Sequence, residues 1–117
     1  MLTDRQVAEF WRDGVVTVPD AVNPTQLAAL RADLDGWVEE SRSHEEPWGE
    51  TLDGRPRFDV QPGHSATRPA LRRVAAPSEV SNAHYEVMVD SAMVDMVAAL
   101  IGPDVKVHHS KVNTKLP

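Results

Sequence analysis

The chain has 117 residues, which is enough for one small domain and too few for two. Eighteen acidic against twelve basic residues give a net charge of -6, which argues against a nucleic-acid or anionic-membrane surface because both need a basic field. Cysteine is absent, so disulfides and thiolate metal sites are excluded. No apolar run has the length of a signal or membrane-spanning segment, and we expect a cytoplasmic protein.

A first helix is predicted directly after the N-terminus. Thr3 and Gln6 have the spacing of a capping box, in which each side chain satisfies a free amide of the other residue. Apolar residues follow at helical spacing, and Gly14 supplies a left-handed helix end. The valine-rich residues 15–18 then predict a short strand.

A second helix is predicted over residues 24–40. Asn23 is its cap, and Pro24 occupies the first helical position. Its apolar stripe is the most regular of the chain and consists of Leu27, Leu30, Leu34, Trp37 and Val38. We interpret the helix–strand–helix region over residues 1–40 as scaffold.

The hydrophobic residues follow neither helical nor strand periodicity over residues 41–68. We interpret this segment as a long lid-like loop, because loops of this length are uncommon unless they bind or cover a ligand. Residues 57–60 predict a short strand within it. His44 and His64 lie in this region, and we interpret both as ordinary loop histidines rather than catalytic groups. Prolines and glycines interrupt every regular pattern: Pro47, Gly49, Gly54, Pro56, Pro62 and Gly63.

The last part of the chain, residues 69–117, is predicted to form a strand, a helix and a second strand. Residues 71–74 predict a strand, and residues 78–85 predict one or two weak helical turns. Asp90 is the expected cap of a helix over residues 91–101, whose methionines are interpreted as core filling.

The terminal residues 105–115 predict a further strand, because Gly102-Pro103 ends the helix and β-branched residues then recur. One face of that strand begins apolar and then becomes polar and cationic. A core-facing row that ends this way is costly unless an anionic or hydrogen-bonding partner meets it, so a binding site is predicted here. The face consists of Val105, Val107, His109, Lys111, Asn113 and Lys115.

The same end of the chain resembles a known family. The segment just upstream of the iron-binding motif of the phytanoyl-CoA dioxygenase family, which includes ectoine hydroxylases, is similar to Leu100-Ile101-Gly102-Pro103-Asp104-Val105 and His109-Ser110-Lys111-Val112-Asn113-x-Lys115. The resemblance extends over most of the chain, from Leu2 to Pro117. It implies an α+β fold with N-terminal helices and the first strands of a jelly-roll (double-stranded β-helix) barrel, and residues 1–117 would be a single, incomplete part of that domain.

The resemblance also implies a chemistry. The family uses iron(II) and 2-oxoglutarate, with the metal held by a His-x-Asp pair and a distant second His. These ligands would follow Pro117, so we expect no metal ligand and no catalytic residue within the 117 residues, and no turnover by them alone. The expected partners are a small-molecule substrate to be hydroxylated and either a C-terminal remainder of the same protein or a second chain that completes the barrel.

Four residues are implied as the site. The residue matching Asn113 hydrogen-bonds 2-oxoglutarate in the family, and an amide can both donate and accept there. Lys111 matches an Arg or Lys beside the site and can pair with a carboxylate. Arg72 or Arg73 matches a basic residue near the co-substrate, and Arg73 is the candidate, although a surface charge pair on an edge strand is an equal alternative. His109 replaces a Gln near the substrate, which leaves the substrate open.

Three other interpretations stay open. The chain can be a non-catalytic interaction module that pairs through an exposed strand edge. It can be a small-ligand binder that uses His109, Lys111 and Asn113 without any metal. The polar end of the last strand can also simply face water.

Overall fold

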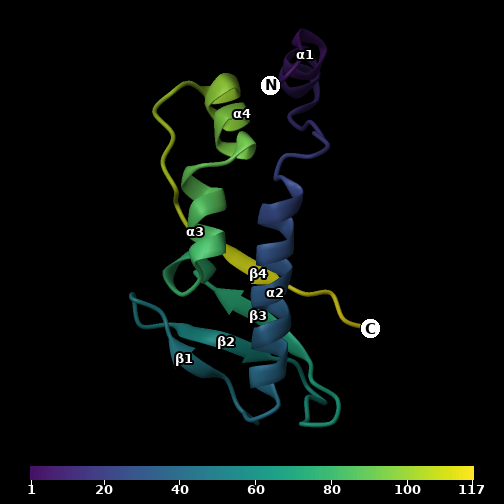
Figure 1. Cartoon of the computed structure of the whole chain (residues 1–117), viewed down its shortest axis with the longest axis vertical. Helices are drawn as coiled ribbons and strands as arrows, with labels where there is room; N and C mark the ends of the chain where they lie inside the picture. Colours follow the sequence, from purple (N-terminus) through teal and green to yellow (C-terminus); the bar gives the residue numbers. More distant parts are fainter.

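The computed structural model describes residues 1–117 and has an α+β fold. Its four strands form one antiparallel sheet in the order β1-β2-β3-β4. Helix α2 lies over one face of this sheet with α3 packed beside it, and no helix covers the other face (Figure 1). The elements are α1 (Asp4–Asp13), α2 (Pro24–Ser41), β1 (Trp48–Glu50), β2 (Pro56–Val60), β3 (Leu71–Ala75), the 3-10 helix η1 (Pro77–Glu79), α3 (Asn82–Val89), α4 (Ala92–Ile101) and β4 (Lys111–Asn113).

Both N-terminal helices begin where local chemistry predicts. The Thr3 hydroxyl accepts from the Gln6 amide N–H at 3.1 Å, and the Gln6 side chain accepts from the Thr3 N–H at 2.9 Å. Asn23 and Gln26 form the same reciprocal pair at the start of α2. Gly14 ends α1 with a φ of 77°, in the left-handed region that favours glycine. These predictions are confirmed.

Two other local predictions are wrong. Residues 15–18 form no strand, because no other strand lies beside them and a valine-rich segment needs a hydrogen-bonding neighbour to become one. Asp90 does not cap α4; the cap position belongs to Ser91. The Asp90 carbonyl instead accepts a hydrogen bond from the Gln26 side chain at 3.2 Å, which ties the α3–α4 junction to the start of α2.

The segment over residues 41–68 is more regular than expected. It contains β1 and β2, which pair as an antiparallel hairpin with Trp48 opposite Phe58. Gly49 has a φ of 71°, and a Cβ on it would lie 3.2 Å from Phe58. The glycine therefore allows both the backbone conformation and the close approach of the Phe58 ring. The strand predicted over residues 57–60 is confirmed as part of β2.

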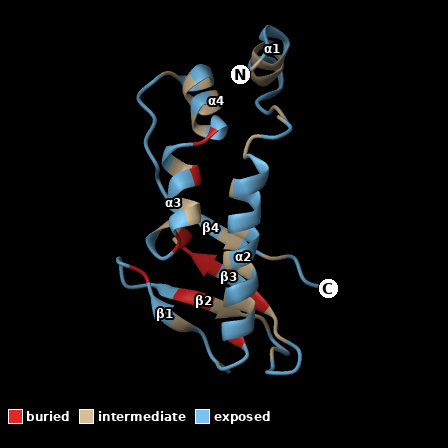
Figure 2. Cartoon of the chain, in the orientation of Figure 1, coloured by how far each residue is buried: buried red, intermediate tan, exposed pale blue.

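A small core lies between the helices and the sheet. Its buried members are Phe58, Leu71 and Val74, and Val74 has no exposed surface. Figure 2 shows that buried residues concentrate at the sheet, whereas α1 and α4 carry exposed and half-buried residues. The partly buried side chains packed on this core are Leu34, Trp37, Val38, Trp48 and Val112.

A β-bulge in β3 decides which residues face the helices. Asp59 lies opposite Arg73 and Val60 lies opposite Leu71, so Arg72 is an extra residue without a partner. In a regular strand Leu71 and Val74 would point to opposite faces, yet both are buried in the core on the helix side. The bulge thus leaves two consecutive arginines, Arg72 and Arg73, exposed.

Strand β4 is shorter than the predicted strand over residues 105–115. Its partner β3 ends at Ala75, and Ala76 has a φ of 47° that turns the chain into η1. The last hydrogen bond of the ladder runs from the Ala76 N–H to the Ser110 carbonyl at 2.9 Å, and residues 105–109 have no neighbouring strand. Val105 and Val107 are therefore 38% and 49% exposed and do not form the expected core row.

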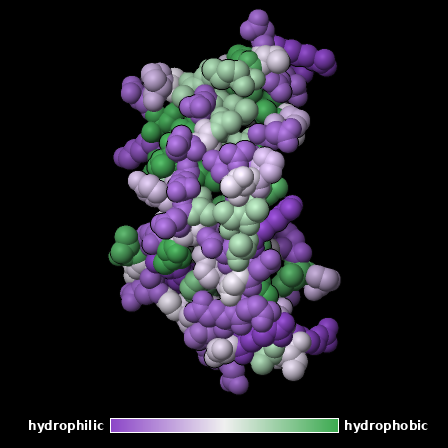
Figure 3. All heavy atoms as spheres, in the orientation of Figure 1, coloured by the Kyte–Doolittle hydropathy of each residue, from purple (hydrophilic) through white to green (hydrophobic).

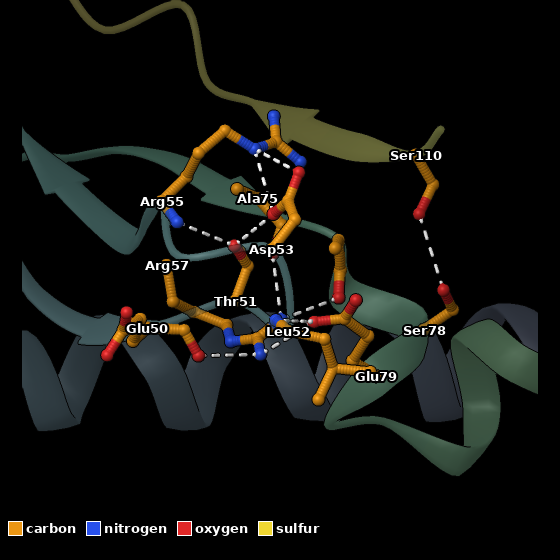
Figure 4. A network of polar contacts seen from close by, with 11 residues as sticks. Glu50, Thr51, Leu52, Asp53, Arg55, Arg57, Ala75, Ser78, Glu79 and Ser110 are labelled. Carbon is orange, nitrogen blue, oxygen red and sulfur yellow. Dashed lines mark hydrogen bonds and ion pairs between the residues drawn. The ribbon is translucent and has the colours of Figure 1, made fainter. Parts of the chain in front are cut away.

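A buried arginine joins the β1–β2 hairpin to η1 (Figure 4). Arg57 is 5% exposed and donates to the carbonyls of Ala76 at 2.8 Å and Glu50 at 3.0 Å. Its guanidinium also pairs with Glu79 at 2.9 Å. The Leu52 N–H and the Arg57 guanidinium together lower the pKa of Glu79 because both stabilise its ionised carboxylate.

The molecule is elongated. Its radius of gyration is 16.7 Å and its extents are 49 × 30 × 27 Å, whereas a compact chain of this length has a radius of about 13 Å. The accessible surface is 8245 Å², against roughly 6,300 Å² for a compact protein of this mass. The excess arises because α1 and α4 extend beyond the sheet and α1 has no buried residue (Figure 1). None of the helices has both the length and the apolarity that a membrane crossing requires.

We predict that Arg57→Met lowers the free energy of unfolding by about 3 kcal/mol, because removal of one member of a buried ion pair leaves the other groups unpaired. Urea unfolding monitored by circular dichroism measures this. Arg12→Gln is the matched control, since Arg12 pairs with Asp13 at 2.8 Å on the surface and should leave the midpoint unchanged. Equal midpoints for both variants would contradict a structural role for Arg57.

Candidate anion-binding site

Two adjoining open hollows lie on the sheet face that no helix covers. Their volumes are about 350 Å³ and 490 Å³, and both are lined by Arg73 and Lys111. We call the combined depression the cationic groove. Its polar lining includes Asp59, Gln61, Arg72, Arg73, His109, Lys111, Asn113 and Lys115.

The β3–β4 register brings three of the predicted site residues together. Arg73 lies directly opposite Asn113, and Lys111 lies opposite Ala75, two residues along the same face. The Thr114 N–H donates to the Arg72 carbonyl at 3.0 Å and holds this register beyond the end of β4. The structure therefore places Arg73, Lys111 and Asn113 side by side, although 38 residues or more separate Arg73 from the other two in the sequence.

Positive charge dominates the groove. Asp59 is the one carboxylate in its lining, and it pairs with Arg72 at 2.6 Å and with Arg73 at 3.5 Å. Lys111 and Lys115 form no ion pair. Two unpaired ammonium groups and a partly engaged guanidinium thus face solvent on one surface, which favours an anionic ligand.

The donors of the groove are accessible. The Arg73 side chain is 47% exposed, and Lys111 and Asn113 are also exposed. The Asn113 amide makes no hydrogen bond within the chain, so both of its N–H donors and its carbonyl are available to a ligand. His109 lies at the edge of the groove, where its ring meets that of His108 edge-on with centroids 4.8 Å apart.

The other histidines of interest are structural. The His64 Nε2–H donates to the carbonyls of Ser41 at 2.9 Å and His44 at 2.8 Å, while its Nδ1 accepts from the Ala70 N–H at 2.8 Å. This fixes one tautomer and ties the end of α2 to the start of β3. The His44 ring stacks on Trp48 with centroids 4.2 Å apart. No group of three or more His, Asp or Glu side chains in the chain could hold a metal ion.

Two residues of the cationic groove, Arg72 and Asp59, were not assigned to the site from the sequence. Arg72 and Arg73 were expected to be alternatives, since neighbours on a strand point to opposite faces, but the bulge turns both to the open face. Asp59 becomes part of the groove only because β2 and β3 pair, which places it opposite Arg73. A bulge depends on pairing between distant segments, so neither role has a local sequence signal.

Comparison of the chain with models of protein families, with curated proteins and with solved structures found no match. The groove is therefore interpreted from its own chemistry. A guanidinium and an ammonium recognise carboxylates through charge-assisted hydrogen bonds, and an amide adds a neutral donor. Donors spread over two adjoining hollows suit a small anion with two carboxylates better than a single point charge.

We predict that Asp59→Asn tightens the binding of glutarate, a five-carbon dicarboxylate, roughly threefold at low salt, because the competing internal carboxylate is removed. Isothermal titration calorimetry measures the dissociation constant. Asp95→Asn, an exposed carboxylate on α4 outside the groove, is the control and should change nothing. Weaker binding in Asp59→Asn would mean that Asp59 orients the arginines rather than competing for them.

Proposed function

We propose that this chain is the N-terminal part of a non-haem iron(II)- and 2-oxoglutarate-dependent dioxygenase that hydroxylates a small molecule. The observation that carries the proposal is the common location of Arg73, Lys111 and Asn113 on the uncovered face of the sheet. The family resemblance assigns co-substrate contacts to these three positions. They come from two strands, so their meeting on one face is additional support from the fold.

The groove residues fit 2-oxoglutarate. This co-substrate has carboxylates at both ends, and the proposal gives Arg73 and Lys111 the role of pairing with them. Asn113 would donate an N–H to the same molecule and orient it. The single contact of Arg73 with Asp59, at 3.5 Å, leaves the other N–H donors of the guanidinium free for the co-substrate.

The residues of this chain do not form a binding site for the iron. None of their His, Asp and Glu side chains gather into a metal-binding group, and the proposal assigns the metal to the His-x-Asp pair and second His that the resemblance implies. Iron with 2-oxoglutarate supplies the oxidising chemistry of this enzyme class. The contribution of residues 1–117 would be to bind and orient the co-substrate and, through His109, to contact the substrate at the edge of the groove.

The α+β architecture supports the jelly-roll part of the proposal. The antiparallel sheet carries helices on one face only, and the cationic groove occupies the other. In a jelly-roll barrel the ligand-binding face of such a sheet points inward against a second sheet. The proposed partner is therefore a set of further strands, on the same protein or a second chain, that covers this face.

A non-catalytic interaction module is the second candidate. Strand β4 pairs with β3 alone, so its other edge offers unpaired N–H and C=O groups to an added strand. This function needs a free edge and makes no use of the donors in the groove. Binding of 2-oxoglutarate therefore separates the two candidates.

We predict that Asn113→Ala weakens 2-oxoglutarate binding roughly fivefold, which corresponds to about 1 kcal/mol for one lost hydrogen bond. Arg73→Gln should weaken it roughly tenfold because a charge-assisted contact is stronger. Calorimetric titration of the protein at low salt, with succinate as a second dicarboxylate, gives the dissociation constants.

Matched controls exist on the helices. Asn82→Ala on α3 and Arg31→Gln on α2 remove the same chemical groups from exposed positions outside the groove. Both should bind 2-oxoglutarate as the unaltered protein does. Absence of any binding, or equal losses in the groove variants and these controls, would reject the dioxygenase proposal and favour the interaction module.

A further inference from the structure

Helix α1 has an apolar face that its own chain covers only in part, since Val7 and Phe10 are half-buried and Trp11 is exposed. Val7, Phe10 and Trp11 lie at i, i+3 and i+4 spacing and therefore on one side of the helix. Trp11 is 66% exposed, and no residue of α1 is buried. Figure 3 shows green, hydrophobic side chains over the end of the molecule that carries α1 and α4, interspersed with purple, hydrophilic ones.

The same chain has an apolar groove without an occupant. A hollow of about 410 Å³ lies between α3, α4 and the extended segment 105–110, which runs alongside both helices (Figure 1). We call it the helix groove. Burial lowers the pKa of His84 in its wall, so this ring is neutral at pH 7 and does not oppose an apolar occupant. Its apolar lining includes Val87 and Met88 of α3, Val94 and Val97 of α4, and Val105 and Val107.

Charge makes the two surfaces complementary. The helix groove is bordered by Lys106, His108 and His109, and no carboxylate lines it. Lys106 forms no ion pair. On α1, Asp4 lies three residues before Val7 and so borders the apolar face, whereas the basic Arg5 and Arg12 lie on the opposite side.

In the structure, α1 does not enter the helix groove of its own molecule. A tethered helix has a high effective concentration near its own groove and would dock there if the geometry allowed it. The Met93 N–H donates to the Ala21 carbonyl at 3.1 Å, which fixes the linker at the start of α4. Figure 1 shows α4 between α1 and the segment 105–110. Because that segment forms one wall of the helix groove, α4 separates α1 from the groove of its own molecule.

We infer that α1 of one copy of this chain docks into the helix groove of a second copy, with Phe10 and Trp11 as anchors and Asp4 facing Lys106. Two such contacts related by a two-fold axis make a dimer by exchange of helices. The recognition is that of an amphipathic helix in a hydrophobic groove. It goes beyond the proposed function and does not depend on it.

Sedimentation equilibrium of the 117-residue protein tests the dimer. We expect a dimer at tens of micromolar and a dissociation constant at least tenfold higher for Phe10→Asp in α1 and for Val97→Asp in the helix groove. Arg5→Asp and Ala99→Asp are the controls, since both lie on the same helices outside the contact and should leave dimerisation unchanged. Circular dichroism melting confirms that each variant is folded.

A mixture of the Phe10→Asp and Val97→Asp proteins gives the sharpest result. The mixed dimer retains one intact contact, between α1 of the Val97→Asp chain and the helix groove of the Phe10→Asp chain. We therefore expect mixed dimers at concentrations where each variant alone is monomeric. A monomeric unaltered protein, dimerisation that neither variant weakens, or a mixture that stays monomeric would each overturn the inference.

Discussion

The interaction on which the rest of the structure depends is the pairing of β3 with β2 through a one-residue bulge. Without the extra residue, Leu71 and Val74 would point to opposite faces of the sheet, and one of them would leave the core. With it, both are buried under α2 while Arg72 and Arg73 face outward together. One irregularity thus provides the apolar core on one face and the cationic groove on the other.

What the sequence predicted well is what neighbouring residues determine. The Thr3–Gln6 and Asn23–Gln26 capping boxes need no tertiary structure, and both helices begin where these boxes lie. The failures concern pairing between distant segments. Residues 15–18 have strand-like composition but no neighbour, and residues 105–109 lack one because the chain turns at Ala76. The grouping of Lys111 with Asn113 follows from strand periodicity, whereas the contribution of Asp59 required the sheet itself.

The chain has three surfaces that its own residues leave open or only partly covered: the outer sheet face, the helix groove and the apolar side of α1. The radius of gyration of 16.7 Å is well above that of a compact chain because α1 and α4 extend beyond the sheet. The chemistries of the three surfaces differ, since the sheet face is cationic and the other two are mainly apolar. The first suits a small anion, and the other two suit each other, so ligand binding and self-association would use surfaces that adjoin at His109.

The central claim is that the open face of β3 and β4 binds a dicarboxylate. Titration of the isotopically labelled protein with 2-oxoglutarate, followed by amide chemical shifts, tests it most directly. The account predicts saturable shifts at Arg73, Lys111 and Asn113, with none along α1 or α4. Shifts that do not saturate, or that fall mainly outside the cationic groove, would contradict it.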